Sequence, residues 1–351
     1  MHPQKVARTD ARCVGYTRGK EVSAIKIVLD ITRLVKEGKL TPQEAEQLQA
    51  LARRDTGSLA INVLMSFGAV AVAAGIIALE PAFATGVSLG VALAAIGLAV
   101  SFFAAEQWGL LGTATTIIGA LLLAGGVIGF AEADFAGLAF SALLFLALAV
   151  AIRSNFLMAL VPLALAGALG SSTGYQHAVY MLTVNEPSIT IVFFALLAGA
   201  AYLVSQRVGQ AYQQLAIIFA RVSLILVNFG FWIGSLWGDY PGETWVQGEN
   251  YRLWSNREAW RNAHLHIPET AFIVGWAIVI VVVGAWAARA NRRWVVTTAA
   301  VFGAIEFYTQ WFERLGAEPW AIIVAGLTIV TFAIGLWRYN LTAGPPDTVT
   351  A

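Results

Sequence analysis

Long apolar runs alternate with short polar breaks from residue 59 to residue 337. Each run is near the roughly 20 residues that a helix needs to cross a hydrocarbon core about 30 Å thick. We therefore predict an all-α fold, a polytopic transmembrane helical bundle of about ten spans with a short N-terminal amphipathic helical hairpin. The fourth and fifth spans are short and are joined only by Arg153-Ser154. The predicted spans are residues 59–79, 83–104, 109–130, 135–152, 155–171, 188–204, 212–237, 270–288, 294–312 and 319–337.

The region before the first span is polar. Residues 1–22 form a predicted flexible tail without the apolar core of a secretory signal. Residues 23–58 predict a cytosolic hairpin of two amphipathic helices, the second ending near Arg54. The run Thr41-Pro42-Gln43-Glu44 is spaced as a capping box with proline at the first helical position. The hairpin either rests on the membrane domain, a second copy or a partner, or serves only as a solubilising lead-in.

Composition supports the membrane assignment. Charged residues make up 12% of the chain, about half the share in soluble domains. No basic stripe indicates nucleic acid as a partner. The single cysteine, Cys13, can close no internal disulfide and lacks the spacing of a zinc site. The composition therefore predicts no cofactor and the lipid bilayer as the main partner. Residues 338–351 read as a disordered tail.

The charges also predict an orientation. With ten spans and both termini inside, 17 of the 22 Lys and Arg residues fall on the inner side and four on the outer side, with Arg221 in the membrane. This bias agrees with the positive-inside rule and predicts cytoplasmic termini. Acidic residues lean the other way, at Glu80, Glu132, Asp134 and Glu186.

Small residues recur four positions apart in the first half of the chain. This spacing lets helices approach closely in lipid, where packing replaces the hydrophobic effect. Tight packing within the chain is the expected use, and self-association through these Gly/Ala-rich spans is the alternative. The pairs are Ala71/Gly75, Gly86/Gly90, Gly90/Ala94 and Gly125/Gly129.

A polar pair is the main candidate for a functional site. Arg221 in the seventh span and Glu306 in the ninth lie at mid-depth, roughly 15 Å and 20 Å from the inner ends at 1.5 Å per residue. Because either charge alone is costly in hydrocarbon, we expect the two to pair. Asn228, Tyr308, Thr309 and Gln310 extend this polar lining outward. The pair is either a structural lock between two helices or part of a solute pathway.

The long outer loop, residues 238–269, is the second candidate. Residues 251–263 predict a helix lying in the interface, with its tryptophans turned toward lipid. His264 and His266 are weak metal candidates, because two His at i and i+2 share a face only on a strand. We accordingly predict no metal site. The chain contains no P-loop, GxGxxG or GxSxG motif, so no catalytic residue is assigned.

The run LVKEGKLTPQEAEQLQALARR (Leu34–Arg54), followed by FGAVAVAAGIIAL (Phe67–Leu79), resembles a bacterial family of predicted polytopic membrane proteins that contain a domain of unknown function. The run VFGAIEFYTQWFERLG (Val301–Gly316) is similar to a late segment of that family. The resemblance implies an amino-terminal helical hairpin before many spans and a bacterial inner-membrane location. It carries no established activity and no catalytic residues.

These patterns favour a non-enzymatic membrane protein that moves a small solute or organises envelope proteins. One alternative is an outer-face enzyme that acts on lipid or an envelope polymer through residues 238–269. Another is a sensor or adaptor that uses the N-terminal hairpin as its docking surface for a protein partner.

Overall fold

The computed structural model describes residues 41–176, 179–246, 254–315 and 318–342. The chain divides into two compact units, Met1–Ser58 and Leu59–Ala351. The helix over residues 42–79 crosses this boundary, and all later elements belong to the second unit. The predicted tail at 1–22, the first helix of the predicted hairpin and residues 343–351 lie outside the described residues.

Helix α2 runs from Pro42 to Leu79 without a break. Its start is the predicted capping box, which the structure confirms. Glu44 N donates to Thr41 Oγ1 at 3.3 Å, and Thr41 N donates to Glu44 Oε2 at 2.9 Å. The predicted end near Arg54 is wrong, because the helix continues into the first apolar run. Residues 55–58 contain no proline, and a single glycine costs only about 1 kcal/mol in a helix.

Seven helices of the described chain are long and apolar enough to cross a membrane, which is compatible with an integral membrane protein. They lie on the first to fourth and the sixth to eighth predicted spans. They are Ile61–Leu79 of α2, α3 (Phe83–Phe103), α4 (Gly109–Phe130), α5 (Phe135–Ile152), α7 (Pro187–Ser205), α8 (Gln210–Trp237) and α10 (Glu269–Arg289).

The other three predicted spans correspond to less apolar or shorter helices. Helix α6 (Asn155–Ala168) and residues 322–335 of α12 (Pro319–Thr342) are apolar but short. Helix α11 (Arg293–Leu315) is long but interrupted by polar side chains, including Glu306. The count of ten spans therefore stays a prediction. Helix α12 also corrects the expected tail, because residues 338–342 are helical.

Two features outside the helical pattern complete the described chain. Residues 171–184 form an antiparallel hairpin of β1 (Ser171–Gln176) and β2 (Val179–Val184), in the register Ser171 opposite Val184. The all-α prediction missed it because two short strands in a loop leave little hydropathy signal. Short 3-10 turns occur at Glu106–Trp108 and Glu243–Trp245, and α9 spans Trp254–Ala263.

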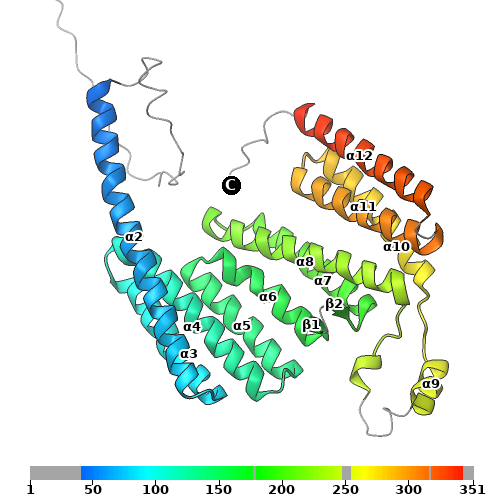
Figure 1. Ribbon diagram of the computed structural model, residues 1–351, viewed down its shortest axis with the longest axis horizontal. Coiled ribbons are helices and arrows are strands. Elements are labelled where there is room, and N and C mark those ends of the chain that lie inside the picture. The colour runs from blue at the N-terminus through cyan, green and yellow to red at the C-terminus, as the bar shows by residue number, and fades with distance from the viewer. Residues whose placement is uncertain (1–40, 177–178, 247–253, 316–317, 343–351) are drawn as a thin grey trace, which may run out of the picture. The chain divides into compact units, whose positions relative to one another are not determined.

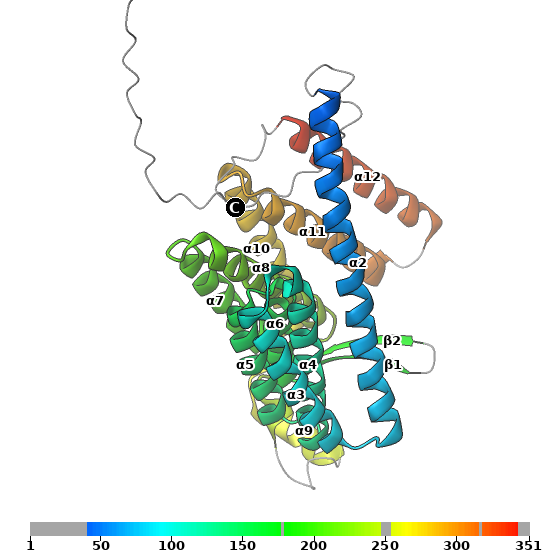
Figure 2. The ribbon, with the colours of Figure 1, turned by 90° about the vertical axis from the view of Figure 1, so that its left-hand side faces the viewer.

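Helix α8 is the central packing element of the described second unit. It contacts α5, α6, α7, α10 and α11. Figure 1 shows α3 to α8 running alongside one another, and Figure 2 shows the β1–β2 hairpin extending away from these helices. Two buried apolar clusters meet at α8. One includes Leu215 with residues of α4, α5 and α6, and the other includes Phe231 with residues of α6, α7, α10 and α11.

Helices α3 and α4 pack through small residues. A Cβ added to Gly119 would lie 2.3 Å from Ala94 N, and one added to Gly90 would lie 2.4 Å from Leu123 N. Such distances require glycine, since the neighbouring atoms belong to backbone. Tight packing is thus confirmed for Gly90/Ala94. Gly75 and Gly125 have nothing within 4 Å, so these two positions play no such part.

Candidate functional site

The predicted ion pair between Arg221 and Glu306 does not form in the described chain. Arg221 is exposed, and its guanidinium lies over the Trp294 ring, 5.2 Å from the ring centroid. Trp294 is the second residue of α11, and Glu306 lies 12 residues further along, about 18 Å at 1.5 Å per residue. The depth that was predicted by counting residues along α8 put Arg221 near the level of Glu306. In the structure Arg221 lies beside the first turn of α11 instead.

Asn228 lies two helical turns beyond Arg221 and is buried. Its Oδ1 accepts a hydrogen bond of 3.0 Å from Trp276 Nε1 on α10, and its Nδ2 donates to Leu224 O at 2.8 Å. Trp276 is 0% exposed, and Asn228 Oδ1 is the only acceptor found for its indole N–H in the described chain. The amide thus fixes the packing of α8 against α10.

A second indole joins α8 to α11. Trp232 Nε1 donates to Thr309 Oγ1 at 3.2 Å. Tyr308, the neighbouring residue, points the other way: it is exposed, and its ring centroid lies 4.3 Å from that of Phe312. Of the predicted lining, Thr309 is therefore brought to the α8–α11 contact and Tyr308 is not.

Glu306 lies three residues before Thr309 on the same helix and is only 8% exposed. One turn toward the start of α11, Phe302 packs against Phe229 and Trp276, with ring centroids 5.8 and 6.4 Å apart. Among the described residues, the Glu306 carboxylate makes no hydrogen bond and no ion pair. The face of α11 that meets α8 thus changes at Glu306 from aromatic to polar.

Two more polar atoms close to this point are buried without a partner in the described chain. They are Gln310 Nε2, one turn beyond Glu306, and Trp311 Nε1. Nearly all buried polar groups in proteins find a hydrogen bond, from protein or from water. Helix α11 thus carries a buried acid and, within five residues of it, two buried donors without partners in the described chain.

The loop predicted to lie on the outer side, residues 238–269, is held by two buried carboxylates at helix ends. Glu186, 0% exposed, precedes α7, and its two oxygens accept the backbone N–H groups of Gly242 at 2.7 Å and Thr244 at 2.8 Å. Asp239 follows α8 and accepts the backbone N–H of Ser188 at 2.8 Å and also the Ser188 hydroxyl. Each carboxylate thus ties the beginning of α7 to the segment that follows α8.

The neck of the loop is closed by backbone pairing. Asp239 and Ile267 exchange two hydrogen bonds of 2.9 Å across residues that are 28 apart in sequence. Gly238, with φ of +65°, turns the chain from α8 into this bridge.

Burial raises the pKa of the Asp239 carboxyl above its ordinary value, although the hydrogen bonds from Ser188 lower it and the charge of Glu186 raises it further.

Inside the loop, Glu243 binds the short helix α9. Its carboxylate accepts from Arg257 Nε at 2.5 Å and from Arg261 Nη2 at 2.9 Å. The Arg261 guanidinium also lies over the Tyr240 ring, 4.8 Å from its centroid, and Tyr240 stacks on His266 at 4.5 Å. A helix is thus present as α9 over residues 254–263 of the predicted 251–263, and ion pairs hold it to Glu243. Its position in the membrane interface stays a prediction.

The two histidines do not converge. His264 stacks on Trp260 with ring centroids 3.9 Å apart, and its Nδ1 lies 2.7 Å from Trp260 O, whereas His266 stacks on Tyr240. No group of three His, Cys, Asp or Glu in the described chain is arranged to hold a metal ion. Trp260 accordingly packs on His264.

The sequence pointed to the loop but not to Glu186 and Ser188 as its anchors. The sequence feature that could have identified these anchors is their position at helix ends. Glu186-Pro187-Ser188 begins one helix, and Gly238-Asp239 ends another. Which carboxylate meets which N–H depends on contacts across more than 50 residues.

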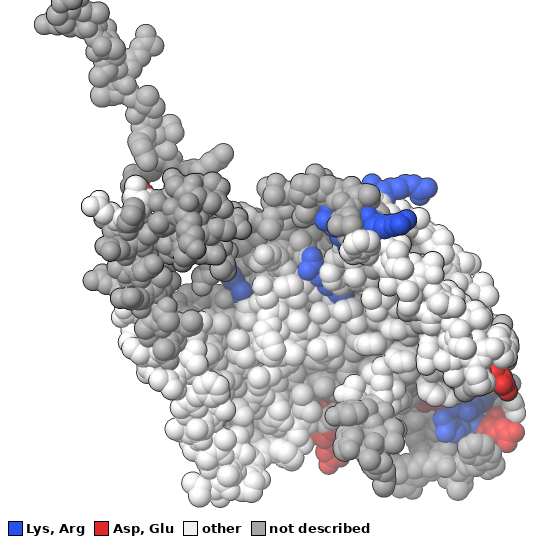
Figure 3. All heavy atoms as spheres, turned by 45° about the horizontal axis from the view of Figure 1, so that its top comes forward, with Lys and Arg blue, Asp and Glu red and all other residues white. Residues whose placement is uncertain are grey.

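Charge is distributed unevenly over the described surface. Figure 3 shows basic side chains gathered toward one end of the face in view, while acidic ones lie toward the other, where a second basic group sits among them.

The chain matches no protein-family profile, no curated protein sequence and no solved structure.

Proposed function

We propose that this protein is a transporter of a proton or a small cationic solute in a bacterial inner membrane, with Glu306 as the binding group. One observation carries the proposal: Glu306, a residue only 8% exposed in the middle of α11, has no ion pair or hydrogen bond in the described chain. An ionised carboxylate without a partner is costly at that depth. A proton or a cation bound from solution supplies the missing charge.

The surroundings of Glu306 support a path toward the outer side. Asn228 and Glu306 each lie nine residues from the outer end of their helix, about 14 Å. Trp232 and Thr309, which bond to one another, lie nearer that end. The unsatisfied Gln310 Nε2 lies at a similar level. Polar groups thus continue from the mid-depth carboxylate to the outer end of the α8–α11 contact.

The orientation is also part of the proposal. The basic turns after α5, α7 and α10 carry Arg153, Arg207 and Arg292, whereas Glu132 and Asp134 follow α4. This bias supports cytoplasmic termini under the positive-inside rule. The resemblance of residues 34–79 to the bacterial membrane family supports the inner-membrane location.

A flux measurement tests the proposal. Full-length protein is reconstituted into liposomes, and proton, sodium, potassium and ammonium gradients are imposed in turn. A pH-sensitive dye reports proton and ammonium flux, and sodium- and potassium-sensitive dyes report the other two ions. We expect flux of at least one of these ions, and its loss in Glu306→Gln. The control is Glu313→Gln, an exposed carboxylate on the same helix, which should keep the flux.

Wild-type liposomes that pass none of the four ions would overturn the proposal. So would a Glu306→Gln protein that folds normally and transports at the wild-type rate. Glu306→Asp, which keeps the carboxylate, should retain part of the flux, and this distinguishes a binding role from a packing role.

The outer-face enzyme stays a hypothesis carried by the composition of the loop. The carboxylates of Glu186, Asp239 and Glu243 are engaged in holding the loop to α7, α8 and α9. The sensor or adaptor hypothesis depends on residues 23–54, of which 23–40 lie outside the described chain.

A further inference from the structure

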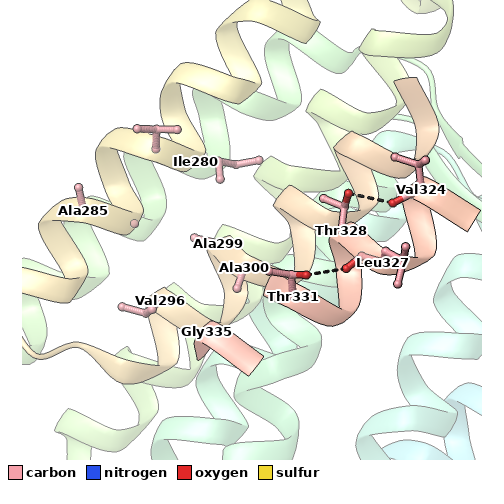
Figure 4. Close-up of a pocket in the computed structure, with 12 residues that line it drawn as sticks. Ile280, Ala285, Val296, Ala299, Ala300, Val324, Leu327, Thr328, Thr331 and Gly335 are labelled. Atoms are coloured by element: carbon pink, nitrogen blue, oxygen red, sulfur yellow. Dashed lines mark hydrogen bonds between the residues drawn. The ribbon is translucent and has the colours of Figure 1, made fainter. Parts of the chain in front are cut away.

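Helices α10, α11 and α12 enclose a groove of about 760 Å³. This volume lies in the range of about 300–1,000 Å³ that is usual for small-molecule sites. Figure 4 shows the wall residues on the three helices, with Ile280 and Ala285 on α10, Val296 and Ala299 on α11, and Thr328 on α12. The groove lies apart from Glu306 and the outer loop, neither of which lines it.

The wall of the groove suits hydrocarbon. Among the described residues of the wall, the only hydroxyl groups are those of Thr328 and Thr331, which donate within their own helix to Val324 O at 2.9 Å and Leu327 O at 2.8 Å. These bonds, drawn as dashed lines in Figure 4, leave the wall with no donor that needs an outside partner. Small residues such as Gly284, whose added Cβ would meet Ala299 Cβ at 3.4 Å, keep the groove open.

The length of the groove matches one leaflet of a bilayer. On α12 its wall runs from Val324 to Gly335, which is about 16 Å of helix. The hydrocarbon core of a membrane is about 30 Å thick, so each leaflet contributes about half of that. An acyl chain that enters from one leaflet therefore fits the groove along its length.

The same end of all three helices carries arginine. Arg289 ends α10 four residues beyond Ala285, Arg293 begins α11 three residues before Val296, and Arg338 follows Gly335 by three residues. Each arginine thus lies within about 6 Å, along its helix axis, of the end of the groove. Residues 285–300 and 331–342 contain no Asp or Glu.

Two tryptophans indicate the depth in the membrane at which the arginine end of the groove lies. Trp286 and Trp337 are exposed, at 48% and 60%, and each lies within three residues of one of these arginines. Exposed tryptophans of membrane proteins gather at the height of the lipid headgroups. The arginines are therefore placed where lipid phosphates lie, on the side with the greater basic charge.

We propose that this groove binds a phospholipid with an anionic headgroup, with one acyl chain between α10, α11 and α12 and the phosphate at the arginine end. The apolar wall holds the chain, and the absence of acidic residues from these segments favours the anionic headgroup. Basic pockets between helices on the cytoplasmic side are a recognised setting for such lipids.

The test compares phosphatidylglycerol with phosphatidylcholine of identical acyl chains. Each lipid is added to delipidated full-length protein in a non-ionic detergent, and the melting temperature is followed against lipid concentration. A ligand that binds only the folded state raises the melting temperature. We expect phosphatidylglycerol to raise it at lower concentrations than phosphatidylcholine does.

Two variants and two matched controls locate the site. Arg289→Gln should weaken phosphatidylglycerol binding roughly fivefold, the effect of one basic side chain near a membrane surface. Arg207→Gln, an exposed arginine in the α7–α8 turn away from the groove, should not. Ala300→Phe fills the groove and should abolish the shift from both lipids, whereas Ala277→Phe, on an exposed position of α10, should keep it.

The proposal is overturned if wild-type protein responds equally to both lipids, or if Arg207→Gln weakens binding as much as Arg289→Gln. It is also overturned if Ala300→Phe keeps the shift. A change of oligomeric state in Ala300→Phe would assign the groove to a second copy of the chain, which likewise excludes the lipid. None of these readouts depends on ion flux, so the lipid site and the transport proposal are tested separately.

Discussion

Trp276 Nε1 donates a 3.0 Å hydrogen bond to Asn228 Oδ1, and this bond joins α10 to the middle of α8. A hydrogen bond between membrane helices contributes roughly 0.6 kcal/mol on average. We expect Asn228→Ala to cost more, about 1–3 kcal/mol, because it leaves a buried indole N–H without an acceptor. Unfolding of the single variants and of Asn228→Ala/Trp276→Phe measures the coupling in a double-mutant cycle.

Trp286→Phe is the control for this cycle, because Trp286 lies on the same helix but is exposed. Its effect should add to that of Asn228→Ala without coupling. A coupling energy near zero between Asn228 and Trp276 would contradict the prediction that this hydrogen bond stabilises the packing of α8 against α10.

The close approach of α3 and α4 gives a second prediction. Gly119→Ala places a Cβ 2.3 Å from Ala94 N, so the two helices must move apart. Overpacking of this kind typically costs about 1–3 kcal/mol. Gly125→Ala, on the same helix but with nothing within 4 Å, should be neutral or stabilising. Thermal unfolding of both variants in one detergent checks this, and equal losses of stability would contradict the packing.

The anchoring of the outer loop gives a third prediction. Glu186→Gln replaces one acceptor oxygen by an NH₂ group, which faces the backbone N–H of either Gly242 or Thr244. The lost bond should loosen residues 242–246 by about 1–3 kcal/mol. Hydrogen exchange of these backbone amides should therefore speed up, while α3 and α4 are unaffected. Glu132→Gln, an exposed outer carboxylate, serves as the control.

Asp239 predicts a pH dependence of stability. Because burial raises the pKa of its carboxyl in the folded protein, the folded state holds this proton more tightly than the unfolded chain does. The contribution of Asp239 to the free energy of unfolding should therefore be greatest at acidic pH and fall as the pH rises through the folded-state pKa. The fall amounts to about 1.4 kcal/mol for each pH unit that separates the folded-state pKa from the unfolded-state pKa. Asp239→Asn should remove this part of the fall.

Melting temperatures between about pH 4 and about pH 8 measure the effect. Ser188→Ala removes the hydroxyl that lowers the pKa of Asp239, so the fall should move to higher pH. Identical pH profiles for the wild type and Asp239→Asn would refute the assignment.

Much of the candidate site could be named from the sequence but not assembled from it. Glu306, Asn228 and Thr309 were recognised because polar residues stand out in apolar runs, and the structure buries Asn228 and Glu306. The partner of Arg221 was predicted wrongly. Helix length measures distance along one axis, and it does not say how far α8 slides past α11.

The amino-acid order was enough to place the ends of the long helices, because hydropathy and capping are local: α4 and α5 lie on the predicted residues 109–130 and 135–152. It was also enough to predict an orientation from the uneven distribution of Lys and Arg. Two contacts and one groove had to come from the folded chain: Arg221 lies over Trp294, Glu186 binds the turn at Gly242, and helices α10, α11 and α12 leave a groove. They depend on helix rotation and sliding, which are set by how side chains from distant segments fit together.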